Sequence, residues 1–273
     1  MERTEPKRIS DEVRDAALRY ITPGGIRKVV RRPKTDVESV HQILPFKGGF
    51  LSTRVWGKSE NKTVLLVHGW AANQTDMFLY VPSLLDAGFK VVAMDLPAHG
   101  ESSFDVAGLN HLGDAVLAVG NAHGQLEGVI AHSVGCAATQ LAIASGLRVG
   151  RVVSLASPND YEAKTYGFAK HIGFSKEQIS EFIAALREFD VRVEIRSVDF
   201  VPNFDMPVLI VHSEDDAVIP ISVGEQLAAY WKNSIFLRVN GLNHRGVLRD
   251  KFVIESAIKF LTDENSSESD PHE

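Results

Sequence analysis

Residues 129–136 read VIAHSVGC, and this short segment decides the fold. A buried apolar run ends at Ser133, and a helical pattern begins directly after it. Small residues, Ala131 and Gly135, stand two positions before and two positions after the serine. This spacing is typical of a nucleophile elbow, a tight turn from strand to helix that exposes a serine hydroxyl above a parallel sheet. Ser133 is therefore the candidate nucleophile; the alternative is an ordinary turn with a capping serine.

On both sides of this segment, short apolar runs alternate with helical patterns, as expected for parallel strands buried on both faces. Two extended runs, 40–46 and 50–56, come first and flank Lys47-Gly48-Gly49, which predicts an antiparallel hairpin. The chain is thus predicted to be α/β, with a mostly parallel doubly wound sheet, a leading hairpin and helices on both faces. The predicted parallel strands are 63–68, 89–94, 127–132, 151–156, 207–212 and 235–239, and the predicted helices are 77–87, 109–124, 134–145, 221–230 and 246–261.

The alternation breaks once, between residues 158 and 206, where polar helical patterns such as 175–187 replace the buried runs. Insertions at the carboxyl ends of strands cover ligand crevices, so we expect 158–206 to form a small helical lid. The α/β core then comprises residues 40–157 and 207–262. Residues 1–39 are expected to hold a short helix and a flank, and residues 263–273 a disordered acidic tail.

Composition and charge narrow the function. The chain has 273 residues, 44% of them hydrophobic, which is ordinary for a globular protein. Its net charge is −6, and removing the five acids of residues 263–273 leaves −1 for the body. Nucleic-acid binders are normally strongly basic, so we expect no nucleic-acid partner. The one basic cluster is interpreted as a solvated flank, with an arm for anionic partners as the weaker alternative; it contains Arg27, Lys28, Arg31, Arg32 and Lys34.

A single cysteine, Cys136, excludes an internal disulfide, and no Cys/His spacing suggests a metal. We therefore expect neither metal nor cofactor. The first residues lack the apolar segment of a secretory signal, and no run of eighteen apolar residues occurs. A cytoplasmic location without stable membrane insertion is expected.

Two later strand ends supply a candidate acid and a candidate base. Asp216 follows the strand predicted at 207–212, and its carboxylate could orient an imidazole and stabilise the imidazolium form; Asp215 is the neighbouring alternative. His244 follows the last strand and is the histidine that comes after the acid at a strand end. Either acid could instead be a solvated loop residue.

An anion that develops next to Ser133 needs hydrogen-bond donors. The backbone N–H groups of Trp70, after the first parallel strand, and of Val134 are the candidates for an oxyanion hole. The indole of Trp70 is also expected to shape the pocket or to pack in the core. His68, His99 and His132 are interpreted as turn or packing residues.

Taken together, these segments resemble the α/β-hydrolase fold superfamily from about Val40 to Leu261. The resemblance rests on VHGW at 67–70, DLPAHGES at 95–102, AHSVG at 131–135, residues 213–220 and GLNHR at 241–245. It implies Ser133 as nucleophile, His244 as general base, Asp216 as its orienter and a helical cap over the site. Small departures occur at Ala131, Cys136 and Ser213, where glycine or alanine is commoner. In detail the chain is most similar to esterase-like bacterial hydrolases.

The expected activity is hydrolysis of a carboxylic ester or thioester, with a small or medium apolar acyl group, through an acyl-enzyme on Ser133. Aromatic residues of the lid hint at an apolar substrate, although they could equally be lid packing; they are Tyr161, Tyr166, Phe168, Phe174 and Phe182. Carbon–carbon bond hydrolysis, acyl transfer, perhydrolysis and a sensor without turnover remain alternatives, since fold alone does not fix chemistry. The expected partner is a small-molecule ester, and a homodimer remains open.

Overall fold

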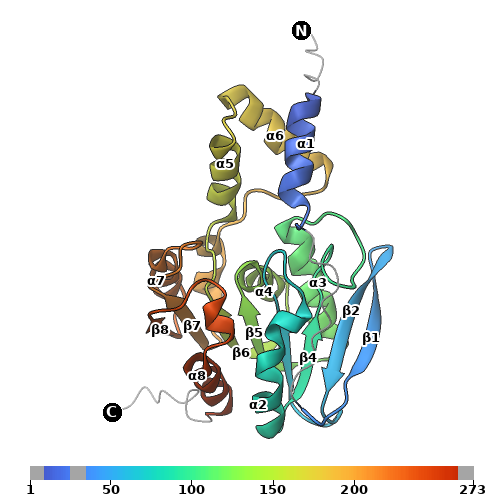
Figure 1. The fold of residues 1–273 in the computed structure, drawn as a ribbon, viewed down its shortest axis with the longest axis vertical. Coiled ribbons are helices and arrows are strands. Elements are labelled where there is room, and N and C mark those ends of the chain that lie inside the picture. The colour runs from blue at the N-terminus through green and yellow to red at the C-terminus, as the bar shows by residue number, and fades with distance from the viewer. Residues whose placement is uncertain (1–8, 25–34, 264–273) are drawn as a thin grey trace.

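Eight strands form one sheet in the order β1-β2-β4-β3-β5-β6-β7-β8 in the computed structural model (Figure 1), which describes residues 9–24 and 35–263. Strands β1 and β2 pair antiparallel, as do β2 and β4, and all other neighbours are parallel. The predicted α/β class is confirmed. The strands are β1 Val40–Phe46, β2 Gly49–Trp56, β3 Thr63–Val67, β4 Lys90–Met94, β5 Leu126–His132, β6 Val149–Leu155, β7 Val208–Ser213 and β8 Ser234–Val239.

Helices cover both faces of the sheet because successive strand residues point to opposite sides. In β3, Leu65 and Val67 pack in one cluster with α3, α4 and α7, whereas Val64 and Leu66 pack in another with α2 and α8. Each such fully buried side chain contributes roughly 1.5–3 kcal/mol to folding. The helices are α1 Asp11–Ile21, α2 Val81–Asp86, α3 Leu109–Ala122, α4 Val134–Ala144, α5 Tyr161–His171, α6 Lys176–Glu188, α7 Ile221–Tyr230 and α8 Lys251–Thr262. Short 3₁₀ helices are η1 Gln74–Tyr80, η2 Ser197–Asp199, η3 Val201–Asn203 and η4 Gly246–Leu248.

The leading hairpin turns within two residues. Phe46 pairs with Gly49, and Lys47 and Gly48 both have positive φ, 44° and 80°. Two positive φ values match the twist of a two-residue hairpin turn, which explains why glycine occurs here.

Two of the predicted helices are each divided. Residues 77–87 belong to η1 and then α2, whose first turn contains Pro82, a residue that has no N–H and fits a helix start. Residues 246–261 begin as η4, and α8 starts anew where the Asp250 carboxylate accepts the Val253 N–H at 3.0 Å. Local capping therefore overrides a continuous apolar period.

Three helices lie together at one end of the molecule, and we call α1, α5 and α6 the cap (Figure 1). Their apolar residues share one hydrophobic cluster, separate from the two clusters of the sheet. Val13 and Ala17 of α1 pack there with Phe182 and Leu186 of α6, so the N-terminal helix joins the segment after β6.

Two predicted features fall outside the described residues: the basic flank within 25–34, and the acidic tail beyond Asp263. Among the helices that are described, none combines the length and hydrophobicity that a membrane span requires.

Candidate active site

Ser133 lies between β5 and α4 in a backbone conformation that few side chains adopt. Its φ is 51° and its ψ is −125°. A Cβ added to Gly135 would lie 2.4 Å from the carbonyl oxygen of His68, so α4 approaches β3 too closely for any side chain there. This close approach holds the strained turn and directs Ser133 to the carboxyl edge of the sheet.

Ser133, His244 and Asp216 form one hydrogen-bonded chain. The Ser133 hydroxyl donates to Nε2 of His244 at 3.0 Å, and Nδ1–H of His244 donates to Oδ2 of Asp216 at 2.7 Å. Asp216 follows β7 and His244 follows β8, two neighbouring parallel strands. The three residues are distant in sequence, and the sheet brings them together in the order that proton transfer requires.

The Asp216 carboxylate is held by its own loop. Its Oδ1 accepts the N–H groups of Val218 at 2.8 Å and Ile219 at 2.9 Å. Burial alone would raise the pKa of Asp216, but the hydrogen bonds from His244 and from these two N–H groups outweigh it and lower that pKa below its usual value. Asp216 therefore stays ionised and keeps His244 in the tautomer whose Nε2 accepts.

Asp215, the alternative acid, points elsewhere. Its Oδ2 accepts the Gly241 N–H at 2.6 Å, which ties the loop after β7 to the loop after β8. The two neighbouring carboxylates thus have different roles. Asp216 contacts the imidazole of His244, and Asp215 fixes the loop that carries His244.

A second histidine supports the first. His132, directly before Ser133, donates from Nε2 to the carbonyl oxygen of His244 at 2.9 Å, and the two rings lie 4.8 Å apart. Burial, with a smaller contribution from the nearby His244, lowers the pKa of His132 to about 3. His132 is therefore neutral and holds the backbone of His244. The sequence identified His132 only as a packing residue, since no local pattern reveals this contact.

The predicted oxyanion donors flank Ser133. Val134 is the first residue of α4, and a Cβ on Gly69 would lie 3.1 Å from the Cβ of Ser133, so the loop that carries Trp70 passes beside the serine. Within the described part of the chain, neither the Trp70 nor the Val134 N–H donates to another backbone or side-chain group. Both donors are free to face a ligand.

Two buried histidines hold the Trp70 loop, as turn residues would. The Leu96 N–H donates to Nε2 of His68 at 3.0 Å. Because Nε2 is the accepting nitrogen, the proton of this ring is on Nδ1, which donates to the Gly69 carbonyl at 2.7 Å. Ala71 N–H donates to Nε2 of His99 at 3.1 Å. Burial lowers the pKa of His68 to about 4, which keeps this ring neutral at physiological pH.

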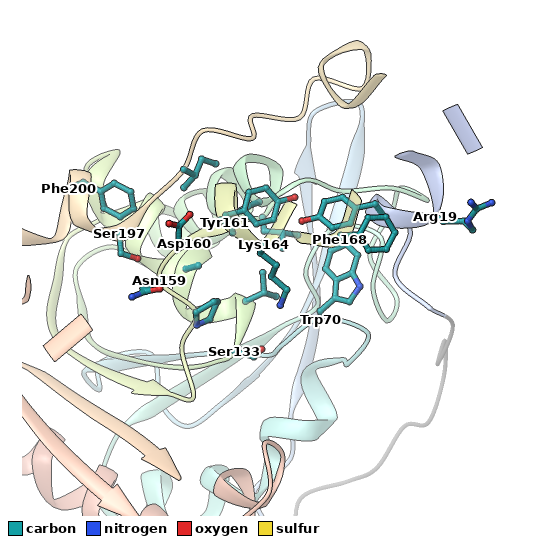
Figure 2. Close-up of a pocket in the computed structure, with 17 residues that line it drawn as sticks. Arg19, Trp70, Ser133, Asn159, Asp160, Tyr161, Lys164, Phe168, Ser197 and Phe200 are labelled. Atoms are coloured by element: carbon teal, nitrogen blue, oxygen red, sulfur yellow. The ribbon is translucent and has the colours of Figure 1, made fainter. Parts of the chain in front are cut away.

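A cavity of about 300 Å³ lies over Ser133 (Figure 2). Its floor includes Ser133, Val134 and Trp70, and its roof comes from the cap. Two of the five aromatic residues noted in the sequence, Tyr161 and Phe168, line it, whereas Phe174 and Phe182 pack inside the cap. Within residues 9–24 and 35–263, no cluster of side chains is arranged to hold a metal ion.

Several lining residues were not anticipated, and three of them are polar or charged residues of the cap. Arg19 and Tyr20 come from α1, and Lys164 comes from α5. Tyr20 reaches the wall because its hydroxyl lies 2.9 Å from Oγ1 of Thr165 on α5. No sequence signal connects α1 with the cavity, because this contact depends on how the cap helices pack.

Several known proteins are similar to this chain. A bifunctional esterase/perhydrolase of Acinetobacter calcoaceticus is 25% identical, with 69% of this chain and 87% of that protein covered. A serine hydrolase-like protein of Danio rerio is 43% identical over 60 residues, but this chain spans just 18% of its length. Among solved structures, an esterase from Pyrococcus furiosus has a TM-score of 0.67 at 16% identity, covering 88% of this chain and 97% of that one. An esterase from Rhodococcus has a TM-score of 0.63 at 19% identity, covering 84% and 99%.

The likeness to these structures extends over almost their whole length and shows a shared fold. The sequence model of the alpha/beta hydrolase family matches residues 64–255, well over half of the chain, and this range includes Ser133, Asp216 and His244. The chain therefore belongs to the alpha/beta hydrolase family.

Proposed function

We propose that this protein is a serine hydrolase that cleaves a carboxylic ester or thioester through an acyl-enzyme on Ser133. The observation that carries the proposal is the hydrogen-bonded chain from Ser133 through His244 to Asp216, at the floor of a cavity. The cavity is at the small end of ligand pockets, which suits a small or medium acyl group. Esterases among the similar proteins support the same reaction class.

Each residue has a defined part in the proposed reaction. The Ser133 oxygen attacks the ester carbonyl while Nε2 of His244 takes its proton. The N–H groups of Trp70 and Val134 stabilise the tetrahedral oxyanion, and the imidazolium then protonates the departing alcohol. Water, deprotonated by His244, cleaves the acyl-enzyme and frees Ser133. The anionic Asp216 stabilises the imidazolium in both halves.

Perhydrolysis is a second candidate, favoured by the similarity to the bifunctional esterase/perhydrolase of Acinetobacter calcoaceticus. In this variant hydrogen peroxide, in place of water, attacks the acyl carbon. The peracid leaves and Ser133 regains its proton, so the same residues serve both reactions. Peracid formation during ester turnover would distinguish the two.

The test is hydrolysis of p-nitrophenyl esters from acetate to palmitate by the wild type, Ser133→Ala and His244→Ala. We expect turnover in the wild type and a loss of roughly 10⁴- to 10⁶-fold in each variant, with folding retained. The preferred chain length would measure the cavity. Full activity of Ser133→Ala would refute the proposed nucleophile.

Labelling of Ser133 by a fluorophosphonate provides a second readout that needs no substrate. Labelling without turnover would support the serine hydrolase assignment and show that the tested esters are not substrates. The absence of both labelling and turnover would favour a ligand-binding protein of the same fold. We also propose a cytoplasmic location, because a single cysteine, Cys136, cannot form an internal disulfide and suits a reducing compartment.

A further inference from the structure

One cationic side chain points into the cavity above Ser133. Lys164 belongs to α5 and lines this cavity. In Figure 2 its side chain extends from α5 toward the floor that carries Ser133 and Trp70. No carboxylate of the described residues forms an ion pair with the Lys164 ammonium.

Of the other charged side chains that line the cavity, Asp160 caps a helix and Arg19 points away from the cavity. The Asp160 carboxylate caps α5, where its Oδ1 accepts the Ala163 N–H at 2.8 Å. The Arg19 guanidinium points away from the cavity in Figure 2. Lys164 therefore supplies the cationic charge inside.

The surroundings of Lys164 favour an anionic ligand. The walls are largely apolar, with Leu112, Ala137 and Ile195 among the lining residues. Lys164 as a whole is exposed, but the protein atoms around its ammonium replace part of the water that would stabilise the charge and so lower its pKa. A carboxylate that entered would restore this stabilisation through a charge-assisted hydrogen bond.

Lys164 is not needed as a base, because the Ser133 hydroxyl already donates to Nε2 of His244 at 3.0 Å. Its place opposite the serine instead suits recognition of a part of the substrate away from the scissile bond.

We propose that the cavity selects esters that bear a carboxylate, separated from the scissile carbonyl by an apolar spacer, and that Lys164 binds this carboxylate. The inference rests on the proposed ester hydrolysis and names its substrate class. The carboxylate can belong to the acyl part, as in the hemiester of a dicarboxylic acid, or to the alcohol part, as in an acylated hydroxybenzoate.

Two matched pairs of esters separate these sources. The p-nitrophenyl hemiester of glutarate is compared with p-nitrophenyl pentanoate, and the acetate ester of 4-hydroxybenzoate with p-cresyl acetate. The kcat/KM ratio within each pair is measured for the wild type, Lys164→Met, Lys164→Arg, Arg19→Met and Lys170→Met. Lys170 is the matched control, since it lies on the same helix, is exposed like Lys164 and does not line the cavity.

We expect the wild type to prefer the carboxylate ester in one pair, and Lys164→Met to lower this preference roughly 10- to 100-fold. Lys164→Arg should retain much of it, and Lys170→Met all of it. The same ratio in the wild type and in Lys164→Met, or no preference in either pair, would overturn the inference while leaving the hydrolase intact. Loss of the preference for the carboxylate ester in Arg19→Met but not in Lys164→Met would also overturn the inference.

A binding experiment separates this inference from the proposed chemistry. Glutarate and 4-hydroxybenzoate are titrated by calorimetry into Ser133→Ala, which cannot turn over, and into Ser133→Ala with Lys164→Met. We expect one of the two anions to bind the first protein and to bind the second at least tenfold more weakly. Equal binding to both proteins, or to neither, would refute the carboxylate site whatever the esterase assay gives.

Discussion

The sheet edge and the cap meet at the same cavity but are built in different ways. At the sheet edge, Ser133, Asp216 and His244 each stand shortly after the end of a parallel strand, and hydrogen bonds between side chains and backbone fix their loops. The cap is held mainly by apolar side chains from α1, α5 and α6, which are remote in sequence. Chemistry is thus encoded locally by strand ends, whereas the pocket above it is encoded by long-range packing.

The largest expected effect separates two adjacent carboxylates at the sheet edge. Asp216→Asn should lower kcat for any ester that is turned over by about 10⁴-fold, because an amide neither fixes the accepting tautomer of His244 nor stabilises its cation. The matched variant Asp215→Asn should lower kcat by less than about tenfold, since among the described groups the Asp215 carboxylate accepts only the Gly241 N–H. Steady-state kinetics decide, and equal losses would contradict the division of roles.

The next effect addresses the cap. Phe182 is fully buried between α1 and α5 and contacts the rings of Tyr20 and Phe168. Phe182→Ala should lower the free energy of unfolding by about 3–5 kcal/mol and should raise KM more than it lowers kcat. Tyr166→Ala removes an exposed ring from the same cap and is the control. Urea unfolding followed by tryptophan fluorescence measures the free energy of unfolding, and ester kinetics measure KM and kcat. If kcat fell as steeply as for Asp216→Asn, the two regions would not be separable.

The same contrast explains what could be predicted from the sequence. The alternation of strands and helices, the elbow at Ser133 and the placement of His244 and Asp216 follow from apolar runs and their ends, because parallel strands deliver their carboxyl ends to one edge. The choice between Asp215 and Asp216 could be anticipated but required the loop geometry to decide. The position of Tyr20 in the cavity wall could not be predicted. Helical spacing shows that α1 has an apolar face, but it does not show which part of the protein this face packs against.

A smaller effect concerns pH and the buried histidines of the sheet edge. The folded-state pKa of His132 is about 3 and that of His68 about 4, both below the value of about 6.5 expected in the unfolded chain. The unfolded state therefore binds protons first. Their contribution to stability is complete above about pH 6.5 and declines as the pH falls toward 4.

Each of these histidines should remove on the order of 1–3 kcal/mol from the free energy of unfolding across this interval. Urea midpoints at pH 7, 6, 5 and 4 measure the decline. His132→Gln keeps a donor for the His244 carbonyl but does not titrate, so its decline should be shallower. An unchanged slope would mean that His132 is not the group responsible.

The smallest effect tests how α1 is attached to the cap. The Tyr20 hydroxyl lies 2.9 Å from Oγ1 of Thr165, and this threonine hydroxyl donates to the carbonyl oxygen of Tyr161 at 2.8 Å. Tyr20→Phe therefore removes the hydrogen bond to Thr165 without leaving the buried Thr165 hydroxyl unpaired, and should cost about 0.5–1.5 kcal/mol for this bond. Thr165→Val alone, and both changes together, complete a double-mutant cycle in urea. A coupling energy near zero would mean that apolar packing alone holds α1 over the cavity, and the contribution of Tyr20 to its wall would then depend on Phe182 and its neighbours.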